Sequence, residues 1–530
     1  MFVRISIFIA ALAAVLALYA WPLSKPQTTI PPLVNGSNNN TVLFIGSEHH
    51  GLTNIHIATV QGLLERHPDI QVHFISYPSV ESKLSRVSAL SKARQPLARD
   101  VIFHALDGQS LTTALRERLE KVGLRDGSEG LERLISPPGV PGLDHLSQLI
   151  EYVMSPWDAE DHLAIYHQIG GIIEKVDPAT IVLDMVFHPA MEAVRSRHWS
   201  HIIISPNTVV DTFMAQQPHG KMLWKYPALG SGFAFPVPWH KIPENMYLMF
   251  RLIYGMVMQP GIREKKAWLE ANGVPNALDM AGTYRDDVPW ITQTTPNAST
   301  PIDFIPANVT CTGPISISSA KAVDIDPELV QWISQKPTVL INLGSVYPYT
   351  VNMTNEFIKG IDRVIKEADV QVLWKYRIEP KTATAANFDW EAAVQPLLDT
   401  GRVRVSTWLK VDPQALLETG YISLFVSHGG AGGYHEGIES GVPLIILPSW
   451  VDLYNFAQLT EQTGLGIWGC REQSPDFNAE CLSDAILKLS DNSPETLAIR
   501  TKSREIRDQI RAKPGRDVAA DMVANMARLQ

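Results

Sequence analysis

The chain has 530 residues, of which 45% are hydrophobic and 19% are charged, and its formal net charge is −10 at pH 7. This length predicts two or three globular domains, and the net negative charge argues against a nucleic-acid-binding surface. The three cysteines, Cys311, Cys470 and Cys481, lack the spacing of a metal site. We therefore expect three free thiols and no disulfide framework.

An apolar segment lies close to the start of the sequence. Residues 5–21 are a continuous run of apolar and small residues behind Arg4, and residues 23–40 form a polar linker. Such a run lies between a signal-peptide core and a minimal membrane span. Because Ala20 offers a poor cleavage site, we expect residues 1–22 to be an uncleaved single-pass membrane anchor, with a cleaved signal as the alternative. Arg4 favours a lumenal body in the endoplasmic reticulum or secretory pathway.

Five Asn-x-Ser/Thr sequons fit a glycoprotein of the secretory pathway. They begin at Asn35, Asn39, Asn297, Asn308 and Asn352. Chance alone supplies several sequons in a chain of this length, so they add modest support to the expected location.

Residues 41–300 are predicted to form the first α/β domain. Short apolar runs typical of buried strands are separated by helical patterns, one of which should begin near Thr53 and Asn54. This alternation predicts a parallel sheet with crossover helices, which is a Rossmann-like arrangement. The predicted strands are residues 41–46, 70–76, 101–105, 181–184 and 201–205.

The end of this domain, residues 206–300, is rich in Pro, Trp and Met. Its apolar stretch 246–258 is interrupted by Arg251 and Gly255 and is too short to span a bilayer. We expect a buried amphipathic helix here. A lid over a ligand pocket and a membrane-surface helix are the alternatives, since Met-rich surfaces adapt to varied apolar ligands.

A linker rich in Pro, Ser and Thr is expected at residues 301–336, followed by a second parallel α/β domain at residues 337–492. The remaining residues, 493–530, are charged and helical, with an interruption at Pro514 and Gly515. The strands predicted for the second domain are residues 337–343, 370–376, 402–406, 422–427 and 443–447.

The most informative segment of the chain is residues 425–469. An apolar strand ends at Ser427 and His428, and a glycine-rich turn then leads into a helix that carries Glu436. Free backbone N–H groups and the helix dipole make such a turn an anion site. The small residues at 429–433 allow the backbone to approach a pyrophosphate closely. The segment therefore predicts a nucleotide site, and Asp452 beyond the next strand could hold a sugar.

This segment resembles the donor-binding signature of the UDP-glycosyltransferase family, the family 1 glycosyltransferases. That signature has roughly the form His-x-Gly-x-x-x-x-x-Glu, Gly-Val-Pro and Pro-x-x-x-Asp-Gln. Leu453 departs from it where most members carry Gln, and the surrounding residues are more similar to fungal members. The matching residues are His428, Gly430, Glu436, Gly441, Val442, Pro443, Pro448 and Asp452.

The resemblance implies a GT-B fold, in which two Rossmann-like domains face each other across a cleft. The first domain would bind the acceptor and the second would bind a UDP-sugar, while the C-terminal helical tail would cross back and pack on the N-terminal domain.

The resemblance also implies a histidine base supported by a carboxylate. His50, in the loop after the first strand, is our choice for the base, with His49 as the alternative. A helix N-terminus beside this loop would keep the imidazole neutral. Asp184 ends a strand and matches the family's supporting acid, although it could instead be an ordinary helix N-cap.

The remaining family positions concern the donor. His428 would bond the pyrophosphate, assisted by the backbone amides of Gly432 and Gly433, and Gly430 is one of the small residues that let the backbone come close. Ser345 matches a Gly-Ser loop that touches phosphate. Glu436 would accept hydrogen bonds from the ribose hydroxyls, and Asp452 from the sugar hydroxyls. The last two positions are Trp408, which would stack on uracil unless it is plain core packing, and Gln414, an approximate match.

No metal or other cofactor is expected. Asp324 and Asp326 form an Asp-x-Asp pattern, but Pro327 follows them, which indicates a helix N-cap. The sequence thus predicts an inverting, metal-independent transferase that moves a hexose from a UDP-sugar to a hydroxyl of an apolar small molecule, sterol or lipid. Glucose is the default donor sugar, and Leu453 leaves others open. A UDP-sugar epimerase or hydrolase, and an inactive UDP-sugar-binding protein, are the alternatives.

Overall fold

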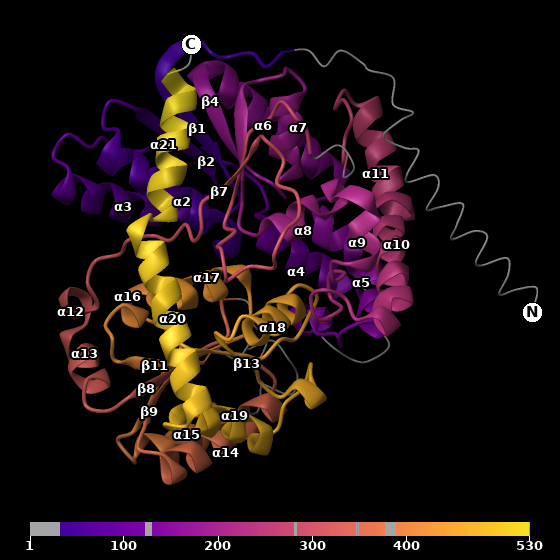
Figure 1. Ribbon diagram of the computed structural model, residues 1–530. Helices are drawn as coiled ribbons and strands as arrows, with labels where there is room; N and C mark the ends of the chain where they lie inside the picture. The colour runs from indigo at the N-terminus through magenta and orange to yellow at the C-terminus, as the bar shows by residue number, and fades with distance from the viewer. Residues whose placement is uncertain are drawn as a thin grey trace, which may run out of the picture.

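Two α/β domains are stacked one above the other in the computed structural model (Figure 1). The structure describes residues 32–121, 130–279, 284–345, 347, 349–376 and 388–528. Each domain has one parallel sheet with helices on both faces, as the alternation of strands and helices predicted. The upper domain in Figure 1 contains the N-terminal residues and the lower one the donor signature.

The N-terminal sheet has the strand order β3-β2-β1-β4-β5-β6-β7 in the described residues. The five strands predicted from sequence are confirmed, and the two last strands were not predicted because each has three residues without a longer apolar run around it. β7 corrects the predicted linker, since it lies within residues 301–336 and pairs with β6. The strands are β1 (Asn38–Ile45), β2 (Gln71–Ser76), β3 (Ile102–Ala105), β4 (Pro178–Asp184), β5 (His201–Ser205), β6 (Trp290–Thr292) and β7 (Val309–Cys311).

The C-terminal sheet has the order β10-β9-β8-β11-β12-β13, again for the described residues. Its five predicted strands are confirmed, and β13 is an additional edge strand. The strands are β8 (Thr338–Asn342), β9 (Gln371–Lys375), β10 (Val403–Ser406), β11 (Ile422–Ser427), β12 (Leu444–Ile446) and β13 (Gly466–Trp468).

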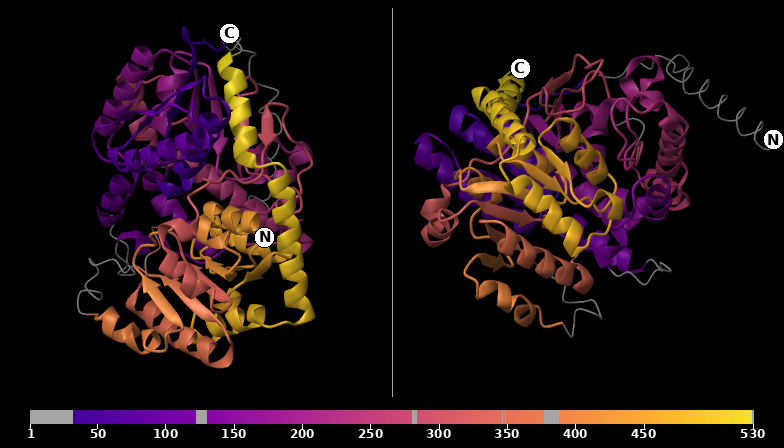
Figure 2. Two further views of the ribbon diagram at one scale, coloured as in Figure 1. Left: turned by 90° about the vertical axis from the view of Figure 1, so that its left-hand side faces the viewer. Right: turned by 60° about the horizontal axis from the view of Figure 1, so that its bottom comes forward.

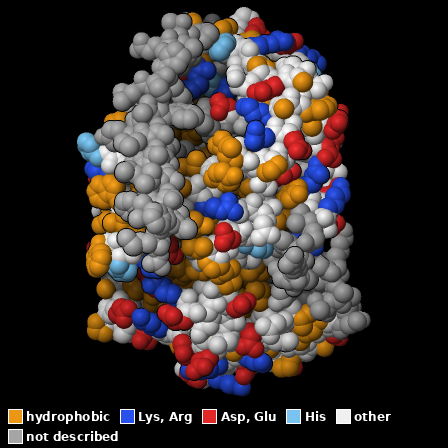
Figure 3. Space-filling view, turned by 90° about the vertical axis from the view of Figure 1, so that its right-hand side faces the viewer, with side chains coloured by type: hydrophobic (Ala, Val, Ile, Leu, Met, Phe, Trp, Pro, Cys, Tyr) orange, Lys and Arg blue, Asp and Glu red, His pale blue; other side chains and the backbone are white. Residues whose placement is uncertain are grey.

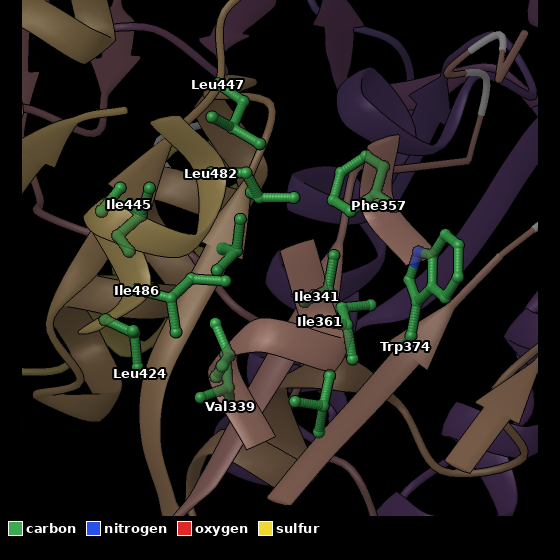
Figure 4. Packing of buried hydrophobic residues seen from close by; sticks show 14 of the residues in the cluster. Val339, Ile341, Phe357, Ile361, Trp374, Leu424, Ile445, Leu447, Leu482 and Ile486 are labelled. Atoms are coloured by element: carbon green, nitrogen blue, oxygen red, sulfur yellow. The ribbon is translucent and has the colours of Figure 1, made fainter. Parts of the chain in front are cut away.

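Apolar strand side chains and helix side chains form the core on one face of this second sheet. Val339 and Ile341 of β8 are fully buried and face Phe357 and Ile361 from one helix and Leu482 from another (Figure 4). This dry packing fixes the sheet rigidly, so the loops at its carboxyl edge start from well-defined positions.

The helices of the N-terminal domain surround the first sheet and then extend into a separate helical layer. They are α2 (His50–Arg66), α3 (Glu81–Arg94), α4 (Leu111–Lys121), α5 (Val140–Met154), α6 (Ala159–Val176), α7 (His188–Arg195), α8 (Val209–Phe213), α9 (Lys221–Trp224), α10 (Ile242–Met258) and α11 (Pro260–Ala271).

The helices of the second domain and the tail follow the linker. They are α12 (Ala322–Ile325), α13 (Pro327–Ile333), α14 (Val351–Glu367), α15 (Trp390–Leu398), α16 (Pro413–Leu417), α17 (Ala431–Ser440), α18 (Leu453–Gln462), α19 (Ala479–Ser490), α20 (Pro494–Ala512) and α21 (Gly515–Arg528).

The C-terminal tail connects the two domains. α20 packs beside α17 of the second domain, and α21 packs against α2 of the first, so the two yellow helices run along one side of the molecule (Figures 1 and 2). Arg66 of α2 forms an ion pair with Asp521 of α21 at 2.7 Å. The tail therefore contacts both domains and is interrupted at Pro514. The buried apolar residues of α21 are Ala519, Ala520, Val523, Ala524 and Ala527.

α10 is amphipathic but only half buried. Leu248 and Met249 pack inward, whereas Tyr247 and Tyr254 are 47% and 59% exposed. The side of the molecule that carries α10 and α11 shows many hydrophobic side chains (Figure 3). No helix among the described residues is long and apolar enough to cross a membrane, and the predicted anchor at residues 1–22 lies outside them.

A disulfide joins Cys470 and Cys481, so the expectation of three free thiols is wrong. Cys470 follows β13 and Cys481 lies in the first turn of α19, and the fold brings them together across the loop between. The spacing of these two cysteines in the sequence matches no motif that would have predicted their pairing. Cys311 remains a free, half-buried thiol.

Candidate active site

The two sheets meet at their carboxyl edges, where loops of the first domain face loops of the second. His50 belongs to the first domain and Trp408 to the second, and their ring centroids are 6.1 Å apart. Ligands of open parallel sheets bind beyond the carboxyl ends of the strands. The expected catalytic loop and the expected donor platform therefore lie side by side where the two domains meet.

The two histidines after β1 lie at the start of α2. The helix begins at His50, with His49 as its N-cap residue, which corrects the expected start near Thr53 and Asn54. The earlier start arises because the N–H groups of Leu52 and Thr53 donate to the carbonyl of His49. Both candidate bases are thus held by the first turn of a helix.

Both imidazoles are neutral at pH 7. Burial lowers the pKa of His50 to about 4, and the nearby charge of Lys83 lowers it further. Burial also lowers the pKa of His49, whose Nδ1 atom is buried without a hydrogen-bond partner in the described residues. Neutral imidazole is the form that can accept a proton, so either residue suits the role of a base.

Asp184 ends β4 and is fully buried. Its carboxylate accepts hydrogen bonds from the N–H of Val186 at 3.0 Å and from the Ser47 hydroxyl at 3.4 Å. Among the described residues it bonds to neither histidine, and it is not the N-cap of α7, which is Phe187. The N-cap alternative is therefore wrong, and Asp184 holds the loop that carries both histidines. Burial raises its pKa to about 6.

His428 follows the carboxyl end of β11, and its ring is packed between two glycines. A Cβ atom added to Gly344 or Gly430 would lie 2.8 or 2.7 Å from the imidazole, which is closer than real contacts allow. Burial lowers the pKa of His428 to about 4, and its Nδ1 atom has no partner in the described residues. The ring is therefore fixed, neutral and able to bond to a ligand.

The glycine-rich turn opens α17 with an uncapped N-terminus. Gly430 is the N-cap residue and offers no side chain to the first N–H groups, and Gly432 has open space where a side chain would be. Gly433 lies against Ser427. The first turn of α17 thus leaves its backbone N–H groups without a side-chain cap, which is the arrangement that an anion-binding turn needs.

Lys375 at the end of β9 is a site residue that the sequence analysis missed. Its ammonium group donates to the carbonyl of Gly344 at 3.0 Å and lies 4.5 Å from the ring centroid of Trp408. Its charge also lowers the pKa of both His50 and His428. Its position at the carboxyl end of a buried parallel strand was the signal that could have found it.

Two other predicted donor residues lie beside Lys375. Ser345 is half-buried and follows Gly344, whose φ of +92° requires glycine. Trp408 is 53% exposed, so the alternative of plain core packing is wrong. An exposed indole with a lysine over its face offers a platform for a planar, electron-rich base.

Glu436 lies two turns into α17 and is half-buried. Burial raises its pKa to about 7, while Lys83 of the first domain opposes this shift. Lys83, which the sequence analysis also missed, donates to the Asn54 side chain at 2.7 Å. Gln414 is buried on α16 and donates to Glu418 at 3.1 Å. Its amide nitrogen is therefore engaged within the second domain, whereas its Oε1 atom is buried without a hydrogen-bond partner among the described residues.

Asp452 is the N-cap residue of α18 and is half-buried. Burial raises its pKa to about 6, with repulsion from Asp211 of the first domain as a further cause. Leu453 is only 2% exposed and packs into the core, so the family's usual Gln is replaced by an apolar contact. Asp211 is a second carboxylate near the expected sugar position that sequence reasoning missed.

The Asp-x-Asp pattern has a structural role. The Asp326 carboxylate accepts a hydrogen bond from the N–H of Leu329 at 2.9 Å and caps α13, which confirms the N-cap prediction. In the part of the chain that the structure describes, no cluster of three or more His, Cys, Asp or Glu residues could hold a metal ion.

The paired sheets, the fixed His428 and the uncapped glycine turn define a nucleotide-sugar-binding protein of the GT-B type. The family described as UDP-glucoronosyl and UDP-glucosyl transferase matches residues 248–472. The glycosyltransferase sdnJ of Sordaria araneosa is 30% identical over 445 residues, covering 82% of this chain and 84% of that protein. The chain therefore belongs to the UDP-glycosyltransferase family.

Two further comparisons fit this assignment. A sterol 3-beta-glucosyltransferase of Komagataella phaffii is 25% identical over 294 residues, covering 53% of this chain and 22% of that protein. A solved UDP-glucosyltransferase from Polygonum tinctorium, described as capable of glucosylating indoxyl, has a TM-score of 0.58 at 16% identity, covering 95% of this chain and all of that one. The solved structure supports the GT-B fold.

Proposed function

We propose that this UDP-glycosyltransferase moves a hexose, with glucose as the first candidate, from its UDP carrier to a hydroxyl group of an apolar small molecule, sterol or lipid. The observation that carries the proposal is the close approach of His50 in the first domain to Trp408 in the second. A neutral base and a platform for the nucleotide base then flank one cleft, as a reaction between two bound substrates requires.

The proposed step is a single displacement with inversion. His50, or His49 in its place, takes the proton of the acceptor hydroxyl, and the oxygen bonds to the anomeric carbon of the sugar. The bond from that carbon to the UDP oxygen breaks, and UDP leaves with the electron pair. Asp184 is a positioning residue in this scheme because it bonds to Ser47 next to the histidine loop.

The charge on the departing UDP is met by groups of the second domain. Three groups surround the region that the diphosphate would enter: His428, the first N–H groups of α17 and the ammonium of Lys375. Fixed donors and a cation at the place where negative charge develops are the usual source of transition-state stabilisation. These groups support a mechanism in which no metal ion is needed.

The apolar acceptor is supported by the composition of residues 206–300 and by the names of the relatives. The segment supplies exposed aromatic and Met side chains on α10 and its neighbours. The Komagataella relative is named for a sterol acceptor. The donor sugar is less constrained, because Leu453 gives no polar contact where other members have one.

Acceptor-dependent release of UDP tests this function against its alternatives. The purified full chain is incubated with UDP-glucose and a panel of sterols, phenols and lipid alcohols, with and without a chelator. Release only with an acceptor, and a product of inverted anomeric configuration, are expected. Release without any acceptor would indicate a hydrolase, interconversion of the UDP-sugar an epimerase, and UDP binding without turnover an inactive binder.

The proposal includes attachment to a membrane of the secretory pathway through residues 1–22, with the described body on the lumenal side. The exposed Trp239, Tyr247 and Tyr254 support contact with a bilayer surface, where aromatic side chains are favoured. Alkaline extraction of membranes from an expressing host is the test. Release of the full chain into the soluble fraction would contradict the attachment.

A further inference from the structure

We propose that the enzyme is N-glycosylated at Asn297 and Asn352, and that Asn308, although it lies in an intact sequon, stays unmodified. In the reaction the asparagine Nδ2 atom bonds to the anomeric carbon of a lipid-diphosphate oligosaccharide and loses one proton. The bond from that carbon to the diphosphate breaks, and the lipid diphosphate leaves with the electron pair.

The disulfide is the first observation behind this proposal. Cys470 and Cys481 are paired in the second domain, and disulfides persist in oxidising compartments such as the lumen of the endoplasmic reticulum. Oligosaccharide transfer to sequons takes place in the same lumen. The disulfide is independent of the sequons and of the apolar segment at residues 5–21, and all three indicate the same compartment.

Asn297 is exposed. It lies in the turn after β6, and its φ of +63° is in the left-handed region, which asparagine tolerates better than most residues. Its side chain forms no hydrogen bond with any described residue. The Ser299 hydroxyl of the same sequon points into the fold, where it accepts the N–H of Thr295 at 2.9 Å. An oligosaccharide at Asn297 would extend into water without displacing a contact.

Asn352 has the same arrangement in the second domain. It is exposed in the first turn of α14, while Thr354 of its sequon is buried and hydrogen bonded to the carbonyl of Thr350 at 2.9 Å. Helix formation does not involve the Asn352 side chain. The folded protein therefore accommodates a glycan at this position as well.

Asn308 has the opposite arrangement. Its Nδ2 atom donates to the carbonyls of Arg285 and Val288, at 2.9 and 2.6 Å, and its Oδ1 atom accepts the hydroxyl of Tyr284 at 2.9 Å. A glycan on Nδ2 would remove one of these donors and require space already filled by the two carbonyls. Leaving a half-buried carbonyl unpaired is unfavourable, so a copy modified here would fold poorly.

The test maps each sequon in the folded protein. The full chain is expressed through the secretory pathway of a yeast, purified by an affinity tag and size-exclusion chromatography, and treated with peptide N-glycosidase in heavy-oxygen water, which labels each formerly glycosylated asparagine. We expect label at Asn297 and Asn352 and none at Asn308. Label at Asn308 would overturn the proposal. The absence of label from both Asn297 and Asn352 would overturn it as well.

Matched variants separate modification from folding. Asn297→Gln and Asn352→Gln should each remove one glycan from the mass of the protein, whereas Asn308→Gln should remove none but lower the melting temperature. Loss of a glycan in Asn308→Gln would contradict the assignment. Transferase activity is measured on the enzymatically deglycosylated protein too, so a failure of this proposal is distinguished from a failure of the proposed function.

Discussion

The two walls of the cleft are built in different ways. In the second domain, His428, the glycine turn, Glu436 and Asp452 come from one continuous segment, and the His428 ring is already fixed between Gly344 and Gly430. In the first domain, the histidines lie at the start of α2 and Asp184 at the end of β4, and Asp184 bonds to Ser47 instead of to a histidine.

This difference fits the proposed mechanism, in which the second domain binds the donor and the first domain carries the catalytic base. We call the residues of the second domain the donor wall and those of the first domain the catalytic wall. The donor wall is preformed, so removing any of its side chains should weaken the binding of the UDP-sugar or the stabilisation of the transition state. The catalytic wall depends on the position of one loop, so changes there should alter the reaction rate while the binding of the UDP-sugar stays intact. Each prediction below tests one side of this contrast.

The largest effect is expected for the base. His50→Ala should lower kcat by roughly 10²–10⁴-fold, since this is the usual contribution of a general base. The dissociation constant for UDP should change little, because the donor wall is untouched. His49→Ala is the matched variant, and calorimetric binding together with steady-state rates measures both. If neither variant slows transfer, the assigned mechanism is wrong.

His428→Ala tests the opposite wall. It removes a fixed imidazole beside the diphosphate and should lower kcat/KM for the donor by roughly 10²–10³-fold, as loss of a charge-stabilising donor does elsewhere. UDP affinity should fall in the same variant, in contrast to His50→Ala. An unchanged affinity for UDP would place the diphosphate away from this residue and remove the distinction between the two walls.

Asp184→Asn should stabilise the protein above pH 7 while it slows the reaction. Burial raises the pKa of Asp184 from its ordinary 3.8 to about 6, so the folded state favours the protonated acid. Its contribution to stability is complete below pH 3.8 and is lost as the pH rises through 6. At pH 8 the buried carboxylate costs about 3 kcal/mol, which a neutral amide avoids.

Melting temperatures of wild type and Asp184→Asn at pH 4 and pH 8 measure this effect. The advantage of the variant should be larger at pH 8 and should shrink at pH 4. A constant difference between the two pH values would mean that Asp184 titrates normally in the folded protein.

Lys375→Met should lower kcat/KM for the donor by roughly 10–100-fold, because a hydrogen bond to a charged group contributes about 1.5–3 kcal/mol. Lys375→Arg should restore part of the activity, since it keeps the charge over Trp408. Lys359 offers a matched control, as it is largely exposed on α14 and pairs with Glu356. If Lys375→Met and Lys359→Met have the same kcat/KM for the donor, the ammonium group of Lys375 does not act on the donor.

Much of the fold was predictable because it depends on local patterns. All ten predicted strands are present, since continuous apolar runs bounded by turns identify buried parallel strands well. β6, β7 and β13 escaped prediction because each has three residues and no longer apolar run around it, whereas the three residues of β12 lie inside the apolar run 443–447. The disulfide between Cys470 and Cys481 was missed because its geometry exists only after β13 and α19 have packed.

The residues of the candidate site could be predicted only where they lie in one continuous segment of the sequence. The donor segment could be recognised residue by residue, and its members lie around the uncapped start of α17. Lys83 and Asp211 could not be recognised in this way, because a single charged residue within a helix has no distinctive spacing, and Lys375 had only its place at the end of a strand as a signal. Their roles follow from the approach of the two domains, which is a tertiary property.

The smallest effect is expected for Trp408. Trp408→Ala should raise KM for the UDP-sugar by about 10-fold, because stacking of a base on an aromatic ring contributes roughly 1–3 kcal/mol. Trp408→Phe should recover most of this loss, and kcat should change little in either variant, since the ring acts on binding. Trp239→Ala is the control, because Trp239 is 83% exposed and lies outside the cleft residues. A large fall in kcat for Trp408→Phe would instead show that the indole holds His50 in place across the 6.1 Å gap, and the catalytic wall would then depend on the donor wall.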